Sequence, residues 1–263
     1  MLMHSAAVLG VGVAAAGMPN WDTARAILRG ERCYQPDPFK PVRTALLPRN
    51  EARRAGTSVR LAFQAAEQAC AGYDPSQRAT VFASSAADTD IADKICANLA
   101  DPNGAVSPTQ FHNSVHNTPA GYWSIATGSR EPASSLSGGR DTFAAGLLET
   151  WATLAHDGEA VLFVTFEAGG GGLIATRRPD IVDSFAVALL LAPGGDQRPT
   201  LEAMEPTQAP ATTLDDALLE RYRHHNPAAR SLSLLAALAT SDHERVVVES
   251  GQGNIAVSAR GCA

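Results

Sequence analysis

Apolar residues in this chain form short unbroken runs that alternate with stretches of helical spacing. The almost wholly apolar runs, which are typical of buried strands, are residues 6–13, 79–83, 160–166 and 185–192. Apolar side chains recur every three or four positions, as on one face of a helix, over residues 21–29, 50–72, 91–99, 118–127 and 142–156. Strands without alternation are usually covered on both faces. The pattern therefore predicts an α/β fold, mostly a parallel sheet with helices on its faces.

The C-terminal third of the chain has a weaker pattern. Residues 215–225 and 231–239 are predicted to be helical, and residues 245–249 are predicted to form a late strand. The stretch 193–210 is rich in loop-forming residues, with room for one more short strand. No internal repeat of fixed period is present. We therefore expect a single domain over residues 1–263.

Composition and charge narrow the classes of protein. Hydrophobic residues make up 45% of the chain and charged residues 18%, as in ordinary globular proteins. The net charge is −6 and the basic residues are scattered, which argues against nucleic acid as a partner. No apolar stretch approaches the roughly 20 residues of a membrane span. The four cysteines form no CxxC pair, so we expect a soluble cytoplasmic protein without a disulfide scaffold.

Several residues that could suggest chemistry have simpler explanations. His112 and His116 are four apart, but no third ligand can be named, so we expect no metal site. The glycine run 169–172 fits neither a Walker loop nor a dinucleotide fingerprint, and it predicts a flexible connection after a strand. The pair Gly10 and Gly12 predicts tight packing. No cofactor is implied.

Three stretches resemble the β-ketoacyl synthases of the thiolase superfamily. The first is Val8 to Val13 followed by Gly17, Trp21 and the run Ile27-Leu28-Arg29-Gly30, which is similar to the family's first strand, glycine turn and first helix. The second is FHNSVHNTPAGYW, residues 111–123, which resembles a stretch at the family's dimer interface. The third, SSLSGGRDTF at residues 134–143, leads through GLLE to the strand VLFV, where condensing enzymes present their cysteine.

That cysteine is absent from the third stretch. In the family it lies at a helix N-terminus, where the helix dipole favours the thiolate that accepts the acyl chain. Either Leu136 or Asp141 aligns with it, and a carboxylate at Asp141 would oppose that role. The two histidines of the family's C-terminal half also have no match, and His243 lies in no corresponding motif.

The resemblance implies a thiolase-like layered fold, like the N-terminal half of a ketosynthase. It is best over residues 6–192, and residues 193–263 diverge. The chain is most similar to short ketosynthase-like proteins of aryl polyene and related type II polyketide or fatty-acid systems. In these systems a chain length factor forms a heterodimer with an active β-ketoacyl synthase, which acyl carrier protein serves.

On this interpretation the chain shapes the partner's acyl tunnel and has no catalytic activity alone. The residues expected at the partner interface and tunnel are Phe111, Ser114, His116, Asn117, Thr118, Ala120, Gly121, Tyr122 and Trp123.

Two alternatives remain open at the level of sequence. The chain could be an independent acyl-transfer or condensing enzyme that uses Ser135, Ser137 or Cys96 as its nucleophile. It could instead be a module that binds acyl carrier protein without a synthase partner. The acidic balance argues against the latter, because carrier proteins are also acidic and like charges slow encounter.

Overall fold

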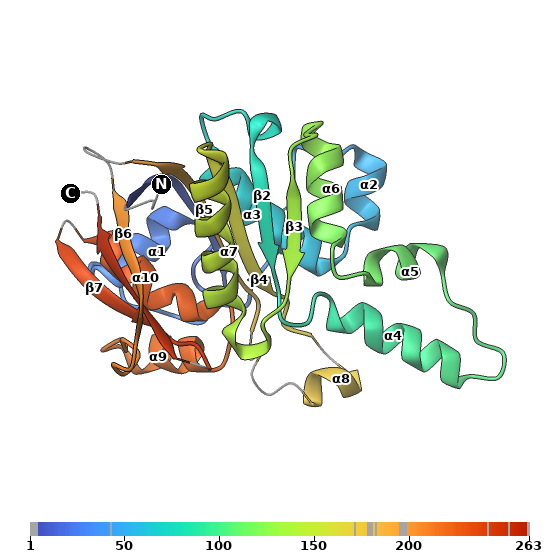
Figure 1. Ribbon diagram of the computed structural model, residues 1–263. Helices are drawn as coiled ribbons and strands as arrows, with labels where there is room; N and C mark the ends of the chain where they lie inside the picture. The colour runs from blue at the N-terminus through green and yellow to red at the C-terminus, as the bar shows by residue number, and fades with distance from the viewer. Residues whose placement is uncertain are drawn as a thin grey trace.

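One mixed sheet runs through the whole computed structural model, which describes residues 5–42, 44–170, 172–177, 181, 183–194, 199–240, 242–251 and 253–261. Its eight described strands lie in the order β3-β2-β4-β5-β1-β6-β8-β7 (Figure 1). The strands are β1 (Ser5–Ala15), β2 (Ala79–Ala83), β3 (Ala133–Leu136), β4 (Val161–Glu167), β5 (Phe185–Pro193), β6 (Thr200–Thr207), β7 (His243–Val248) and β8 (Asn254–Arg260).

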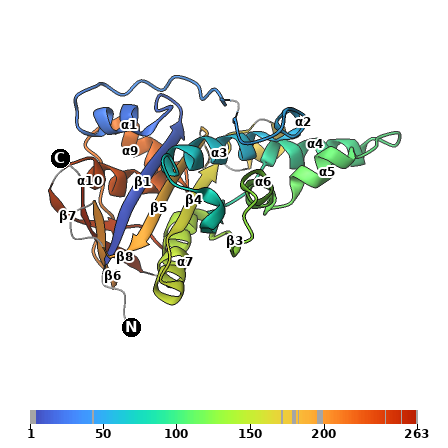
Figure 2. The same cartoon turned by 90° about the horizontal axis from the view of Figure 1, so that it is seen from above.

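Helices cover both faces of this sheet. The α-helices are α1 (Trp21–Leu28), α2 (Arg49–Arg54), α3 (Thr57–Ala69), α4 (Thr89–Ala100), α5 (Pro108–Ser114), α6 (Thr118–Thr127), α7 (Thr142–Asp157), α8 (Gly172–Thr176), α9 (Ala217–His224) and α10 (Leu232–Ala239). One apolar core lies between the sheet and α1, α7, α9 and α10, and a second lies between the sheet and α2, α3 and α6. Figure 2 shows α3 and α7 on opposite sides of β4 and β5. The predicted layered α/β fold is confirmed.

Parallel pairing is restricted to one end of the sheet. β2 pairs in parallel with β3 and with β4, whereas the other pairings among the described strands are antiparallel. The prediction of a mostly parallel sheet therefore holds for β3, β2 and β4 and is corrected for the rest. Helices on both faces bury a strand whether it is parallel or antiparallel to its neighbours. The unbroken apolar runs of β4 and β5 therefore indicate burial and not the direction of pairing.

Most predicted helices and strands agree with the structure within one or two residues, and β2 and α6 have the predicted bounds. The predicted helix over 50–72 is two helices, because the chain is extended at Ala55 and Gly56 between α2 and α3. At this break the carboxylate of Asp88 accepts hydrogen bonds from the backbone and the hydroxyl of Ser58. The side chain of Asp88 also caps α4 by accepting a hydrogen bond from the backbone N–H of Ile91.

The close approach of β1 and α3 explains Gly10 and Gly12. A methyl group added at Gly10 would lie 2.0 Å from the carbonyl oxygen of Ala69, and one at Gly12 would lie 1.9 Å from that of Ala65. Only glycine allows the strand to touch the helix backbone here. The lone G-x-G is therefore a packing feature, as predicted.

Two helices project from the β3 side of the sheet. α4 and α5 contact each other and extend away from the body of the protein in both views (Figures 1 and 2). Thr89 is the one buried residue of α4, and the side chains of Leu99 and Phe111 are 70% and 65% exposed. No helix in the described part of the chain is long and apolar enough to cross a membrane.

Candidate functional site

The turn between β3 and α7 lies where the resemblance places a nucleophile. β3 ends at Leu136, a short 3-10 turn covers Gly139–Asp141, and α7 begins at Thr142. The Thr142 hydroxyl donates a hydrogen bond of 2.7 Å to the carbonyl of Gly139 and accepts one of 3.1 Å from the N–H of Gly138. Gly139 has a positive φ of 59°. The turn is therefore tight, and the positive φ of Gly139 suits glycine.

Asp141 is held by an ion pair at the start of α7. One of its carboxylate oxygens lies 3.2 Å from Nη1 of Arg230, and the other accepts a hydrogen bond of 2.8 Å from the N–H of Gly251. Arg230 is 3% exposed, and its Nη2 lies 3.1 Å from Glu249. Burial lowers the pKa of Arg230, and the carboxylates of Glu249 and Asp141 oppose that shift. Guanidinium groups still remain charged in proteins, so Arg230 requires these two partners.

The ion pair continues beyond Arg230. Glu249 also lies 3.5 Å from Nη1 of Arg223, which is bonded in turn to Glu220 in α9. The hydrogen bond from Arg223 is the main cause of the lowered pKa of Glu220. The network links the start of α7 to α9 and to the connection between β7 and β8. Asp141 therefore has a structural partner at each oxygen.

The two positions proposed for the missing cysteine have different environments. Leu136 is half-buried and packs against the core on the α7 face, whereas Asp141 belongs to the ion-pair network. Neither side chain offers a thiol. Of the cysteines that the structure describes, Cys33 and Cys96 are exposed and Cys70 is buried; Cys262 lies outside the described residues.

The carboxyl ends of the three parallel strands meet beside this turn. Glu167, the last residue of β4, is fully buried and accepts a hydrogen bond from the N–H of Ser85, while the Ser84 hydroxyl lies 3.4 Å from its carboxylate. His116 Nε2 lies 2.8 Å from the carbonyl oxygen of Ser84, and the Ser137 hydroxyl donates to that of Ser85. These polar atoms hold the loops together. Sequence reasoning missed Glu167, although a charge at the end of an apolar strand was a visible signal.

The alternative nucleophiles are not brought together. Ser135 lies within β3, Ser137 follows that strand and bonds to a backbone carbonyl, and Cys96 lies on the projecting helix α4. Neither hydroxyl has a hydrogen bond to an imidazole in the described residues. A base within hydrogen-bond reach is the usual requirement for activating such a group.

The residues predicted at the partner interface divide into two groups. Trp123 is fully buried and packs edge-on against Phe63 with ring centroids 5.0 Å apart. Those that belong to the chain's own interior are Thr118, Ala120, Tyr122 and Trp123. The second group is accessible at the surface: Phe111, Asn117 and Gly121 are exposed, and Ser114 and His116 are half-buried. His112 packs against Tyr122, and α5 ends before His116, so the two histidines do not share a helix.

A surface suited to a partner lies at the β3 end of the sheet. β3 pairs with β2 on one side and with none of the other described strands on its other side, so its outer backbone is unpaired. α6 lies beside β3 and exposes Gly121 and Ile125, whose side chain is 74% exposed (Figure 1). Phe111 is exposed on α5, which contacts α6. We call the outer edge of β3 with Gly121 and Ile125 the β3 edge surface.

The described residues contain no group of three or more His, Cys, Asp or Glu side chains placed to hold a metal ion.

Comparison with known protein families identifies one whose model matches most of this chain. The model of the β-ketoacyl synthase N-terminal domain matches residues 27–254. The match extends well into residues 193–263, which were expected to diverge from the family. A comparison with curated protein sequences finds no significant match.

Solved structures of the same architecture come from ketosynthase complexes. A chain of the complex of the ketosynthase ApeO with its chain length factor ApeC, from Xenorhabdus doucetiae, is 25% identical with a TM-score of 0.71, and the match covers 97% of this chain and 99% of that one. A chain of the ishigamide ketosynthase/chain length factor is 12% identical with a TM-score of 0.71, covering 98% and 100%. A chain of AntDE:AntF, a type II acyl carrier protein in complex with its ketosynthase, is also 12% identical with a TM-score of 0.71, covering 99% and 100%.

Proposed function

The chain belongs to the family of β-ketoacyl synthase N-terminal domains, and from that membership we propose that it is a non-catalytic subunit similar to a chain length factor. It forms a heterodimer with an active β-ketoacyl synthase and shapes the acyl tunnel of that partner. The pathway is aryl polyene synthesis or a related polyene, polyketide or fatty-acid synthesis. Acyl carrier protein meets the complex through the active partner.

The observation that carries this proposal is the turn before α7, which contains no cysteine and holds the paired carboxylate of Asp141. A condensing enzyme needs a thiolate there, and this chain has a carboxylate paired with the buried Arg230. The fold of a synthase is present without its nucleophile, so its remaining use is assembly with a subunit that has one.

The β3 edge surface supports the assembly part of the proposal. An unpaired strand edge offers backbone donors and acceptors to a strand of another chain. The exposed side chain of Ile125, in α6 beside β3, adds apolar area. Gly121 has no side chain that could keep a partner away. The space beside it is also open, because no atom of this chain lies within 4 Å of a methyl group placed there. A partner helix can therefore approach α6 closely.

The structure narrows the residues proposed to shape the tunnel. Trp123 and Tyr122 are packed in this chain's own core, where they fix the position of α6. Phe111, in the middle of the projecting helix α5, has a large side chain that is exposed and free to contact a partner. We propose Phe111 as the residue whose bulk limits product length. We also place the protein in the cytosol, in keeping with three described cysteines that form no disulfide.

An interface variant tests the proposal. Ile125→Asp places a charge on the β3 edge surface, and Leu218→Asp, on the opposite side of the molecule in α9, is the matched control. We expect the wild type and the control to co-purify with a co-expressed β-ketoacyl synthase. The affinity of Ile125→Asp should fall at least about tenfold, which is about 1.4 kcal/mol. Co-purification of the Ile125 variant at wild-type yield, or of none of the three proteins, would refute the proposal.

A further inference from the structure

The loop between β2 and α4 contains a strained residue. Ala87 has a positive φ of 55°, and Ala203 in β6, at 46°, is the other non-glycine residue with a positive φ in the described part of the chain. This left-handed conformation is unfavourable for a residue with a Cβ atom, so it persists only where the surroundings hold it. Such residues cluster at functional sites. We call residues 84–88 the β2 loop.

Buried hydrogen bonds hold the β2 loop from within and from β4. The hydroxyl of Ser84, which is fully buried, accepts a hydrogen bond of 2.8 Å from the backbone N–H of Ala87. The same hydroxyl lies 3.4 Å from the carboxylate of Glu167, which also accepts a hydrogen bond from the N–H of Ser85. Ser84 therefore holds the strained residue in place, and Glu167 holds Ser84.

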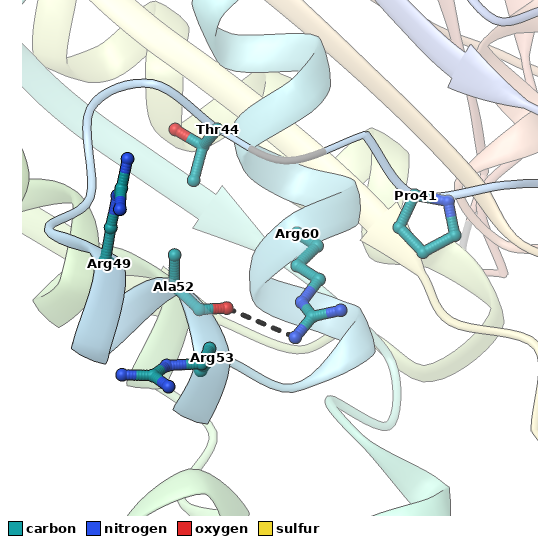
Figure 3. Close-up of a pocket in the computed structure, with 6 residues that line it drawn as sticks. All are labelled: Pro41, Thr44, Arg49, Ala52, Arg53 and Arg60. Atoms are coloured by element: carbon teal, nitrogen blue, oxygen red, sulfur yellow. Dashed lines mark hydrogen bonds between the residues drawn. The ribbon is translucent and has the colours of Figure 1, made fainter.

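The β2 loop is also anchored to the start of α3. Asp88 accepts hydrogen bonds from the backbone and the hydroxyl of Ser58. Two residues further along α3, Arg60 reaches across the break between the helices, and its Nη2 donates a hydrogen bond of 3.1 Å to the carbonyl oxygen of Ala52 in α2 (Figure 3). The first turn of α3 is thus bonded to both α2 and the β2 loop.

Two carbonyl oxygens of the β2 loop bond to the two elements of the β3 edge surface. His116 Nε2 lies 2.8 Å from the carbonyl oxygen of Ser84, and because a carbonyl only accepts, this nitrogen carries the proton. His116 lies in the connection into α6, two residues before Thr118. The Ser137 hydroxyl, just after β3, donates to the carbonyl oxygen of Ser85 at 3.3 Å. The loop is therefore bonded beside both α6 and β3.

The start of α6 depends on this directional contact. Its N-cap residue, Asn117, makes no side-chain capping hydrogen bond. Trp123 packs the middle of the helix into the core, but apolar packing is non-directional. The bond from His116, the residue before the N-cap, therefore fixes this end of α6 relative to the sheet.

We propose that the strained β2 loop holds the β3 edge surface in the geometry that binds the synthase, with Ser84 and His116 as positioning residues. A surface already held in its bound geometry loses less conformational freedom on association, which raises affinity. The inference rests on the proposed function, because the partner is the synthase. Ser84 is fully buried in this chain, so it acts on the partner only through the loop.

Ser84→Ala tests the loop without changing the surface. It removes the hydroxyl that holds Ala87, so the affinity for the synthase, measured by surface plasmon resonance, should fall about threefold or more, as for one weakened hydrogen bond. Backbone amides of residues 121–125 should exchange hydrogen faster in the free chain, because the start of α6 is less well held. Amides of residues 186–190 in β5 should exchange as in the wild type. Circular dichroism confirms that each variant is folded.

Variants of His116 separate positioning from a general loss of stability. His116→Leu removes the bond to the Ser84 carbonyl, so the affinity should again fall about threefold or more. His116→Gln keeps an N–H donor, and its affinity should stay within about twofold of the wild type. The control is His156→Leu in α7, where the side chain is 88% exposed, and it should stay within the same range. These variants decide the question where Ser84→Ala does not fold.

Relief of the strain gives a further test. Glycine adopts the left-handed conformation without the steric cost that alanine has. Ala87→Gly added to Ser84→Ala should therefore recover about half or more of the lost affinity on a logarithmic scale. Ala203→Gly added to Ser84→Ala is the matched control and should recover none.

The inference is overturned by wild-type affinity or unchanged amide exchange in Ser84→Ala, by wild-type affinity in His116→Leu, by equal losses in His116→Leu and His116→Gln, or by equal recovery from Ala87→Gly and Ala203→Gly. In each of these cases the wild-type chain binds the synthase, so the proposed function stands. A wild-type chain that does not bind the synthase would refute the proposed function, and this inference with it.

Discussion

Asp141 joins the start of α7 to the C-terminal part of the chain through Arg230 and Gly251. A carboxylate at a helix N-terminus interacts favourably with the helix dipole, as a thiolate would. Here the carboxylate of Asp141 forms an ion pair with the buried guanidinium group of Arg230. Asp141, one of the two positions proposed for the missing cysteine, therefore acts as a structural anchor.

Asp141→Asn should destabilise the protein. Arg230 would lose the charge of one of its two carboxylate partners while remaining buried. Breaking a buried pair costs up to about 3–5 kcal/mol, and because a third of the Asp141 side chain is exposed we expect about 1–3 kcal/mol. Denaturant unfolding measures this, with Asp22→Asn as the control, since Asp22 is 88% exposed. A loss below about 0.5 kcal/mol, the range of ordinary surface substitutions, would contradict the structural role of Asp141.

The cysteines differ in reactivity for a physical reason. Burial raises the pKa of the Cys70 thiol to about 12, because the thiolate is disfavoured in apolar surroundings. Cys33 and Cys96 are exposed. In the folded protein at pH 8, iodoacetamide followed by peptide mapping should modify Cys33 and Cys96, and Cys70 only after denaturation. Rapid modification of Cys70 in the native state would show that the end of α3 is more open than described.

At the scale of elements, the backbone of β1 approaches the backbone of α3 so closely that only glycine fits at Gly10 and Gly12. Gly12→Ala should cost about 1–3 kcal/mol or more, since its methyl group would collide with the Ala65 carbonyl oxygen. Gly121→Ala in α6 is the matched control, because it meets no atom within 4 Å. Alanine is the better helix former, so the control should be neutral or stabilising by up to about 1 kcal/mol. Equal thermal stability of the two variants would argue against this packing of β1 on α3.

Local pattern was sufficient for most elements, but it missed four of them and joined α2 to α3. β2, α6 and α7 follow from apolar spacing, because their buried faces are long and continuous. β3 was not predicted, because this strand has only four residues, Ala133–Leu136, and is half-exposed at the sheet edge. α5, α8 and β8 were also missed. The edge strand matters most, because it forms the proposed partner surface.

The site was less predictable than the fold. The absence of cysteine was visible in the sequence, but the pairing of Asp141 with Arg230 joins residues 89 positions apart and depends on the tertiary fold. Trp123 was expected at an interface because of its size, whereas the interior of this chain takes up its whole side chain. Ile125 is two residues further along α6 and points outward.

The molecule as a whole has the architecture of a synthase domain, an anchored turn in place of the nucleophile, and an unpaired strand edge at one end of its sheet. These features belong together if the chain completes another subunit. Its own stability then depends on the two apolar cores, while catalysis depends on the partner.

Native mass spectrometry of this chain co-expressed with a β-ketoacyl synthase, after incubation with acyl-loaded carrier protein, tests the central claim most directly. We predict a heterodimer in which the synthase subunit alone gains the mass of the acyl group. Absence of a heterodimer, or an acyl adduct on this chain, would contradict the account.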